Sequence, residues 1–151
     1  MLRHAVATLA YRSGKALRDA PEGFGDFQAG SGARTPVEIL AHMGDLLEWA
    51  LSIADGKPNW GPAAPQSWDK ECKRYFSALA AFDARLASHE PIQRTPERLL
   101  QAPVADALTH TGQLTLMRRM AGSPVRGENY YVAPIAAGKV GPDQDPPRSE
   151  F

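Results

Sequence analysis

Apolar residues recur at three- and four-residue steps in four stretches of the chain, a spacing that places them on one face of an α-helix. These stretches are residues 2–19, 35–54, 67–88 and 103–122. A short helical turn that begins at Thr95 precedes the last of them, which we expect to open at Pro103. No comparable run alternates apolar and polar residues as a half-buried strand would. The pattern therefore predicts an all-α fold, a four-helix bundle.

The second helix has the clearest start signal in the sequence, Thr35-Pro36-Val37-Glu38. Threonine is a good N-cap, proline suits the first helical position, and glutamate three residues after the threonine completes a capping box. The pair Asp55-Gly56 supplies the stop. These signals predict a helix from residue 36 to about residue 54, and they set which side chains face the core.

The connections and the C-terminal end carry less regular patterns. The loops after the first and second helices are long enough for either an up-down-up-down bundle or one with a crossover. Residues 123–151 are rich in proline and lack a helical period, which predicts a long irregular tail. We therefore expect a bundle domain over residues 1–122 and an extended tail over residues 123–151, packed on the bundle or on a partner subunit.

Charge and composition narrow the classes of function. Seventeen basic residues balance seventeen acidic ones, so no overall positive field favours nucleic acid, and we expect none to bind. No apolar run approaches the roughly 20 residues of a membrane span, so we expect no membrane partner. The single cysteine, Cys72, excludes an internal disulfide, and the N-terminus lacks the apolar core of a signal peptide. These features fit a cytoplasmic protein in which Cys72 is a small core residue.

Three side chains form a candidate divalent-metal site. Asp106 and His110 are four residues apart in a predicted helix, so they project from the same face. His42, beside the apolar stripe of the second helix, would supply a third donor and leave positions open for a ligand. Nitrogen and carboxylate donors suit zinc, nickel, manganese or iron(II). The spacing also allows a hydrogen-bonded core histidine and an aspartate that favours a helix N-terminus.

A histidine in the middle of the second helix, followed by His110-Thr111-Gly112-Gln113 in the fourth, resembles the DinB/YfiT-like superfamily of metal-binding four-helix bundles. In that superfamily the fourth helix carries two histidines four residues apart. Asp106 stands at the first of these positions, so the resemblance implies a site of two histidines and one aspartate. It also implies a divalent cofactor, zinc or nickel first and manganese or iron as alternatives, and a homodimer.

The resemblance implies a metal-dependent enzyme, a thiol S-transferase or isomerase that activates a thiol or water. Its partners would be a low-molecular-weight thiol and a small electrophilic substrate, and no catalytic residue beyond the metal ligands is recognisable. The alternative is a non-catalytic or vestigial metal-binding bundle, a stress-associated interaction protein. Asp106 in place of histidine and the lack of an acid/base motif favour that alternative.

Two further residues of the fourth helix each have two interpretations. Gln113 either supports a ligand or is solvated. Gly112 either gives space beside the metal or is a surface glycine.

Overall fold

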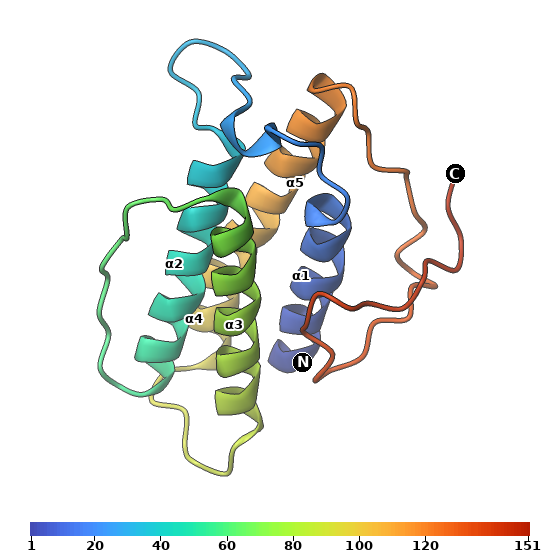
Figure 1. Cartoon of the computed structure of the whole chain (residues 1–151). Coiled ribbons are helices and arrows are strands. Elements are labelled where there is room, and N and C mark those ends of the chain that lie inside the picture. The colour runs from blue at the N-terminus through green and yellow to red at the C-terminus, as the bar shows by residue number, and fades with distance from the viewer.

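The computed structural model describes the whole chain, residues 1–151, and it confirms the all-α four-helix bundle (Figure 1). The four long helices are α1 (Leu2–Leu17), α2 (Pro36–Ala54), α3 (Trp68–Ala87) and α5 (Ala105–Met120). Shorter elements are a 3-10 turn (Phe24–Asp26), α4 (Pro96–Leu99) and a π-helical turn (Leu100–Val104). Together the long helices enclose one apolar core.

The helices α2 and α3 run in the same direction, which decides the connectivity that the sequence left open. Arg74, early in α3, contacts Asp45 at the middle of α2, and Arg85, late in α3, contacts Asp55 just beyond the end of α2. The connection of residues 55–67 must therefore return along the length of α2, as Figure 1 shows. The bundle consequently has a crossover between its second and third helices.

The helix α1 packs against both α3 and α5. Arg3 at its start forms an ion pair with Asp83 near the end of α3, so these two helices are antiparallel. At its other end, the buried Arg118 of α5 donates to the carbonyl of Ala16, so α1 and α5 run in the same direction. The resulting order is up-down-down-up, with α5 antiparallel to α2.

The predicted capping box at the start of α2 is confirmed. The backbone N–H of Glu38 donates to the Thr35 hydroxyl, and the backbone N–H of Thr35 donates to the Glu38 carboxylate at 2.7 Å. Because these contacts satisfy two N–H groups that would otherwise be free at the helix N-terminus, α2 begins at Pro36. They thereby set the rotation of every later α2 side chain, including His42.

The prediction that Pro103 opens the fourth helix was wrong. Pro103 lies inside the π-helical turn that joins α4 to α5 without a break. Proline has no N–H to donate, and its ring clashes with the carbonyl four residues earlier in a regular α-helix. The wider π-helical turn accommodates both features while the chain stays helical. Proline is common at the first position of a helix, which favours a helix start at Pro103. Pro103 is buried, however, and its packing against the core keeps the segment helical on both sides of it.

The tail over residues 123–151 contains no helix and no strand, apart from one isolated bridge between Glu128 and Glu150. The buried Glu128 accepts from the Tyr11 hydroxyl and from Lys15, both in α1, and Val140 joins the apolar core. The tail therefore packs on the bundle of its own chain. Contact with a partner subunit stays a prediction.

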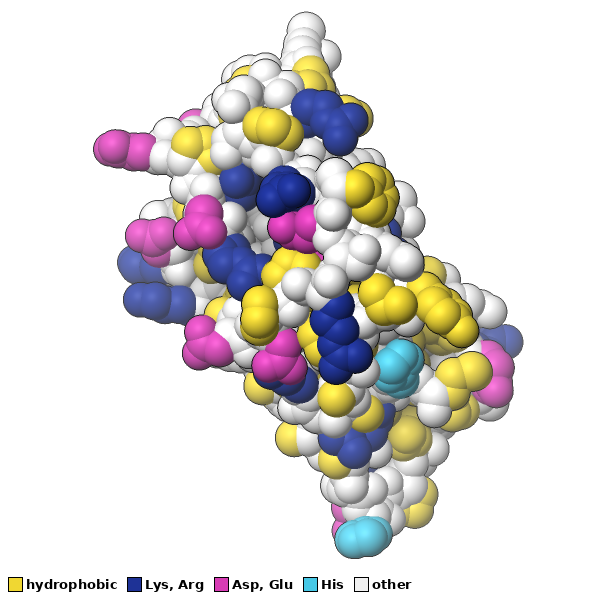
Figure 2. Space-filling view, turned by 90° about the vertical axis from the view of Figure 1, so that its right-hand side faces the viewer, with side chains coloured by type: hydrophobic (Ala, Val, Ile, Leu, Met, Phe, Trp, Pro, Cys, Tyr) yellow, Lys and Arg dark blue, Asp and Glu magenta, His cyan; other side chains and the backbone are white.

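The surface of the protein shows the charge balance that the composition predicts. Basic and acidic side chains are mixed over the face that carries the tail, with no continuous area of one sign (Figure 2). This mixture agrees with the balanced total charge. None of the helices combines the length and the apolar character that crossing a membrane requires.

Candidate metal centre

The three predicted ligands come together between α2 and α5. His42 Nε2 lies 3.6 Å from Asp106 Oδ2, and His110 Nε2 lies 3.5 Å from Asp106 Oδ1. The two imidazole rings meet edge to face, with their centroids 4.9 Å apart. One donor atom from each residue lies within 4.8 Å of the others, so the group is close enough to hold a metal ion.

Helix periodicity explains why these side chains face one another. On α5, Ala107 and Leu114 are fully buried in the core, and the ligands occupy the neighbouring edge of that buried stripe. On α2, His42 adjoins the buried Met43, and it too lies at the border of the core. Because α2 and α5 pack side by side, the two borders meet.

The donor set fits a divalent transition metal. A tetrahedral ion bound at about 2.0–2.1 Å holds its donor atoms roughly 3.4 Å apart. Each imidazole Nε2 lies within a few tenths of an ångström of that distance from a different oxygen of Asp106, and one donor atom from each residue lies within 4.8 Å of the others. The Asp106 side chain is 47% exposed, whereas His42 is 22% and His110 is 12% exposed. The centre therefore opens to solvent on the aspartate side, where a ligand could enter.

Gln113 orients the His110 ring. Its Oε1 lies 2.8 Å from His110 Nδ1, and because an amide oxygen can only accept, Nδ1 must carry the proton. The lone pair of the neutral ring is therefore on Nε2, the nitrogen that faces Asp106. Such hydrogen bonds fix the tautomer and the orientation of metal-binding histidines. Of the two interpretations of Gln113, the structure favours the one in which it supports a ligand.

The electrostatics of the centre favour a neutral His42. Burial is the largest influence and lowers the pKa of His42, and the nearby His110 and Arg34 lower it further, while Asp106 opposes them. A neutral imidazole keeps the lone pair that coordination needs. The arrangement thus prepares His42 for a metal at neutral pH.

Two tryptophans adjoin the centre, and sequence reasoning did not assign them to it. Trp60, in the loop between α2 and α3, meets the His42 ring edge to face at 5.8 Å. Trp49 of α2 contacts Trp60 in the same manner at 5.5 Å. Their only sequence signals are a large aromatic residue within a glycine- and proline-rich loop and another on the flank of α2. The crossover brings Trp60 back alongside α2, and no local pattern specifies that return.

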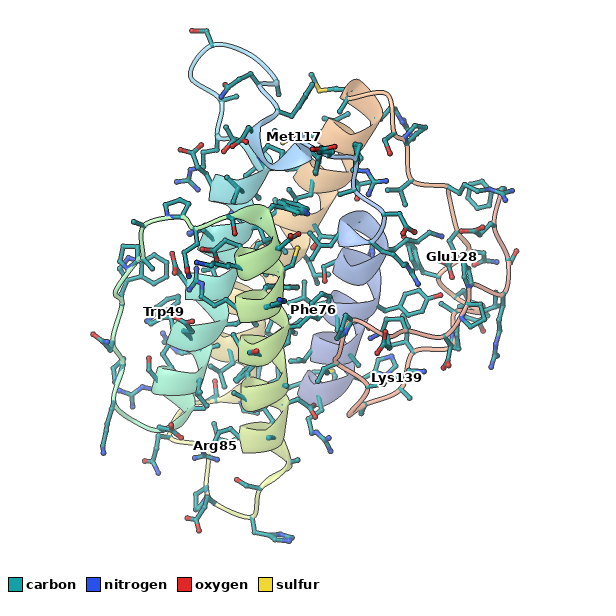
Figure 3. The ribbon with its side chains drawn as sticks, viewed as in Figure 1. Trp49, Phe76, Arg85, Met117, Glu128 and Lys139 are labelled. Atoms are coloured by element: carbon teal, nitrogen blue, oxygen red, sulfur yellow. The ribbon has the colours of Figure 1, made fainter.

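Cavities lie on both sides of the centre along the α2–α5 groove. One, of about 400 Å³, includes His110, Gln113 and Arg34, and its walls are Ala29, Ala33, Ile39, Leu116, Met117 and Met120. The other, of about 380 Å³, includes Asp106 and Trp49, with Leu46, Gln101, Ala102, Ala105 and Thr109. Trp49 and Met117, labelled in Figure 3, mark the two regions. A ligand could therefore approach the metal position from either side.

Other residues singled out in the sequence lie outside the centre. A Cβ at Gly112 would meet no atom within 4 Å, so Gly112 is an open surface glycine. Burial, together with the nearby carboxylates of Asp69 and Glu71, raises the pKa of the Cys72 thiol to about 12, so Cys72 is not an activated nucleophile. His4 and His89 are exposed.

Comparisons with known protein families, curated proteins and solved structures found no match to this chain. The resemblance to the DinB/YfiT-like superfamily therefore stays a prediction that depends on His42 and the motif around His110.

Proposed function

We propose that the protein is a divalent-metal-dependent enzyme that joins a small thiol to an electrophile, with His42, Asp106 and His110 as the metal ligands. The observation that carries this proposal is the group of three donors on two packed helices, with a cavity on each side. Zinc and nickel suit two imidazoles and one carboxylate, with manganese and iron as alternatives. The thiol chemistry and the single free cysteine fit the reducing cytoplasm as its location.

A divalent ion in this centre would lower the pKa of a coordinated thiol or water and provide a nucleophile at neutral pH. The chain's own residues prepare the position. Gln113 holds the His110 ring, and Trp60 covers one side of His42. Asp106 would offset one of the two positive charges of the cation, and its exposed side leaves room for substrate.

The proposal is tested first by metal content, measured by elemental mass spectrometry on protein purified without a histidine tag. We expect near-stoichiometric metal in the wild type and its loss in His42→Ala and Asp106→Ala. His89→Ala is the matched control, because His89 is exposed and remote from the centre. The proposal fails if folded wild type is metal-free and also refuses added zinc, nickel, manganese and iron(II).

The alternative function is a non-catalytic metal-binding bundle that acts as an interaction protein. The composition of the cavities favours it, since beyond the three ligands neither cavity contains a carboxyl, imidazole or thiol group that could serve as a separate base. The two functions are distinguished by mixing metal-loaded protein with a generic electrophile and a panel of small thiols. Accelerated conjugation that is lost in His110→Ala supports the enzyme, and silence across the whole panel supports the interaction protein.

A further inference from the structure

We propose that the two cavities beside the metal centre bind two different substrates, a small anionic thiol next to Arg34 and an uncharged, flat electrophile next to Trp49. The inference rests on the proposed thiol-transfer function and names its substrate classes. It follows from the contrast between the cavities, which are similar in volume, at about 400 and 380 Å³, but different in chemistry.

The cavity next to Arg34 suits an anion. Arg34 is its only lysine or arginine, and this exposed guanidinium forms no ion pair or side-chain hydrogen bond within the protein. A free guanidinium presents its N–H groups in a fork that matches a carboxylate. Ile39 and Met117 give apolar walls to this cavity, which His110 also lines. A small thiol with a carboxylate could therefore contact Arg34 while its sulfur reaches the centre.

Arg34 also borders the same cavity as His110 and Gln113. An anion bound to Arg34 would therefore share this cavity with a ligand of the metal position. A volume of about 400 Å³ is at the small end of the range for ligand pockets, which fits a compact thiol and not a large cofactor.

The cavity next to Trp49 suits an uncharged molecule. It contains no lysine or arginine, and its only charged group is Asp106 at the centre. The indole of Trp49 and the side chain of Leu46 supply apolar area, while Thr109 and Gln101 supply neutral polar groups. Aromatic side chains favour flat partners through stacked or edge-to-face contacts. An anion would find no counterpart of Arg34 in this cavity, which separates the two substrate classes.

The reaction that joins the two substrates is a substitution at carbon. The thiol loses its proton to solvent, and its sulfur forms a bond to the electrophilic carbon. The bond from that carbon to its leaving group breaks, and a chloride leaves with the bonding electrons. Because the cavities lie on opposite sides of the centre, both substrates can be bound at once without competing.

The test uses the zinc-loaded full-length protein and two thiols that differ in one group. N-acetylcysteine carries a carboxylate, whereas N-acetylcysteamine is the same thiol without it, and chlorodinitrobenzene serves as the flat, uncharged electrophile. In Arg34→Gln we expect the KM for N-acetylcysteine to rise about fivefold, equivalent to about 1 kcal/mol, with that for N-acetylcysteamine unchanged. Calorimetry without the electrophile should show the same change in Kd. Arg148→Gln is the matched control, since Arg148 is exposed, lies in the tail and lines neither cavity.

The second cavity is tested with Trp49→Leu, and with Trp49→Phe in case the first variant folds poorly. We expect the KM for chlorodinitrobenzene to rise severalfold in Trp49→Leu and less in Trp49→Phe, with the KM of either thiol unchanged. The inference is overturned if Arg34→Gln raises the KM of both thiols equally, or if Trp49→Leu raises the KM of the thiol as much as that of the electrophile. Either result leaves the proposed function standing. If the zinc-loaded wild type conjugates neither thiol to chlorodinitrobenzene, both this inference and the proposed function are refuted.

Discussion

Replacing Lys15 by methionine should test how the tail is held on the bundle. Lys15 Nζ lies 2.8 Å from Glu128 Oε2 and 2.6 Å from Glu150 Oε1. The Lys15 side chain is 8% exposed and that of Glu128 is fully buried. Methionine has a similar length but no charge, so the variant leaves the Glu128 carboxylate buried without its cation.

The expected cost follows from that burial. Breaking a buried ion pair by removing one partner costs about 3–5 kcal/mol, because the remaining charge is uncompensated. The Tyr11 hydroxyl still donates to Glu128 at 2.7 Å, which favours the lower end of this range. We therefore expect the free energy of unfolding to fall by about 3 kcal/mol. For a chain of this length the melting temperature should fall by about 6–12 °C.

Urea and thermal unfolding followed by far-UV circular dichroism measure this change. The double variant Lys15→Met with Glu128→Gln should recover most of the loss, because the amide is neutral and its oxygen still accepts from Tyr11. Lys139→Met is the matched control, since Lys139 (Figure 3) forms an ion pair with Asp145 in the same tail that is half-exposed and should be worth about 1 kcal/mol or less. If the two lysine variants lose equal stability, or if the second substitution recovers nothing, the reasoning about the buried charge is refuted.

Other predictions concern the helices and the centre. Gly44→Ala should lower the free energy of unfolding by about 1–3 kcal/mol, because the new Cβ would lie 2.9 Å from Arg74 Cζ. Gly112→Ala should raise it by about 0.5–1 kcal/mol, because a Cβ there meets no atom within 4 Å and alanine favours the helix. Equal effects of the two variants would contradict this contrast. Gln113→Leu should weaken zinc affinity about tenfold in a competition titration with a chelator, and unchanged affinity would remove Gln113 as a positioning residue. The pKa of the Cys72 thiol rises from 9.0 to about 12, so its thiolate fraction below pH 9 falls about a thousandfold. Iodoacetamide should therefore label Cys72 far more slowly in the native protein than in the unfolded protein. Equal labelling rates would show that the thiol is not protected.

The helices and one half of the centre could be predicted from sequence because they depend on local interactions. The Thr35 capping box acts within one turn, and it located the start of α2 to the residue. Asp106 and His110 share a face because residues four apart do so in any α-helix, even though the predicted start of that helix at Pro103 was wrong. Local steric rules explain both successes.

The tertiary structure decided how the helices meet. The parallel course of α2 and α3 depends on long-range contacts such as that between Arg74 and Asp45, which no helical period encodes. The π-helical turn at Pro103 depends on burial, because a solvent-exposed proline could have ended the helix instead. Trp60 and Arg34 lie in loops, whose paths follow from the elements that they connect. Sequence alone therefore determined which side chains share a helix face, whereas packing between distant segments determined that His42 faces Asp106 and what surrounds them.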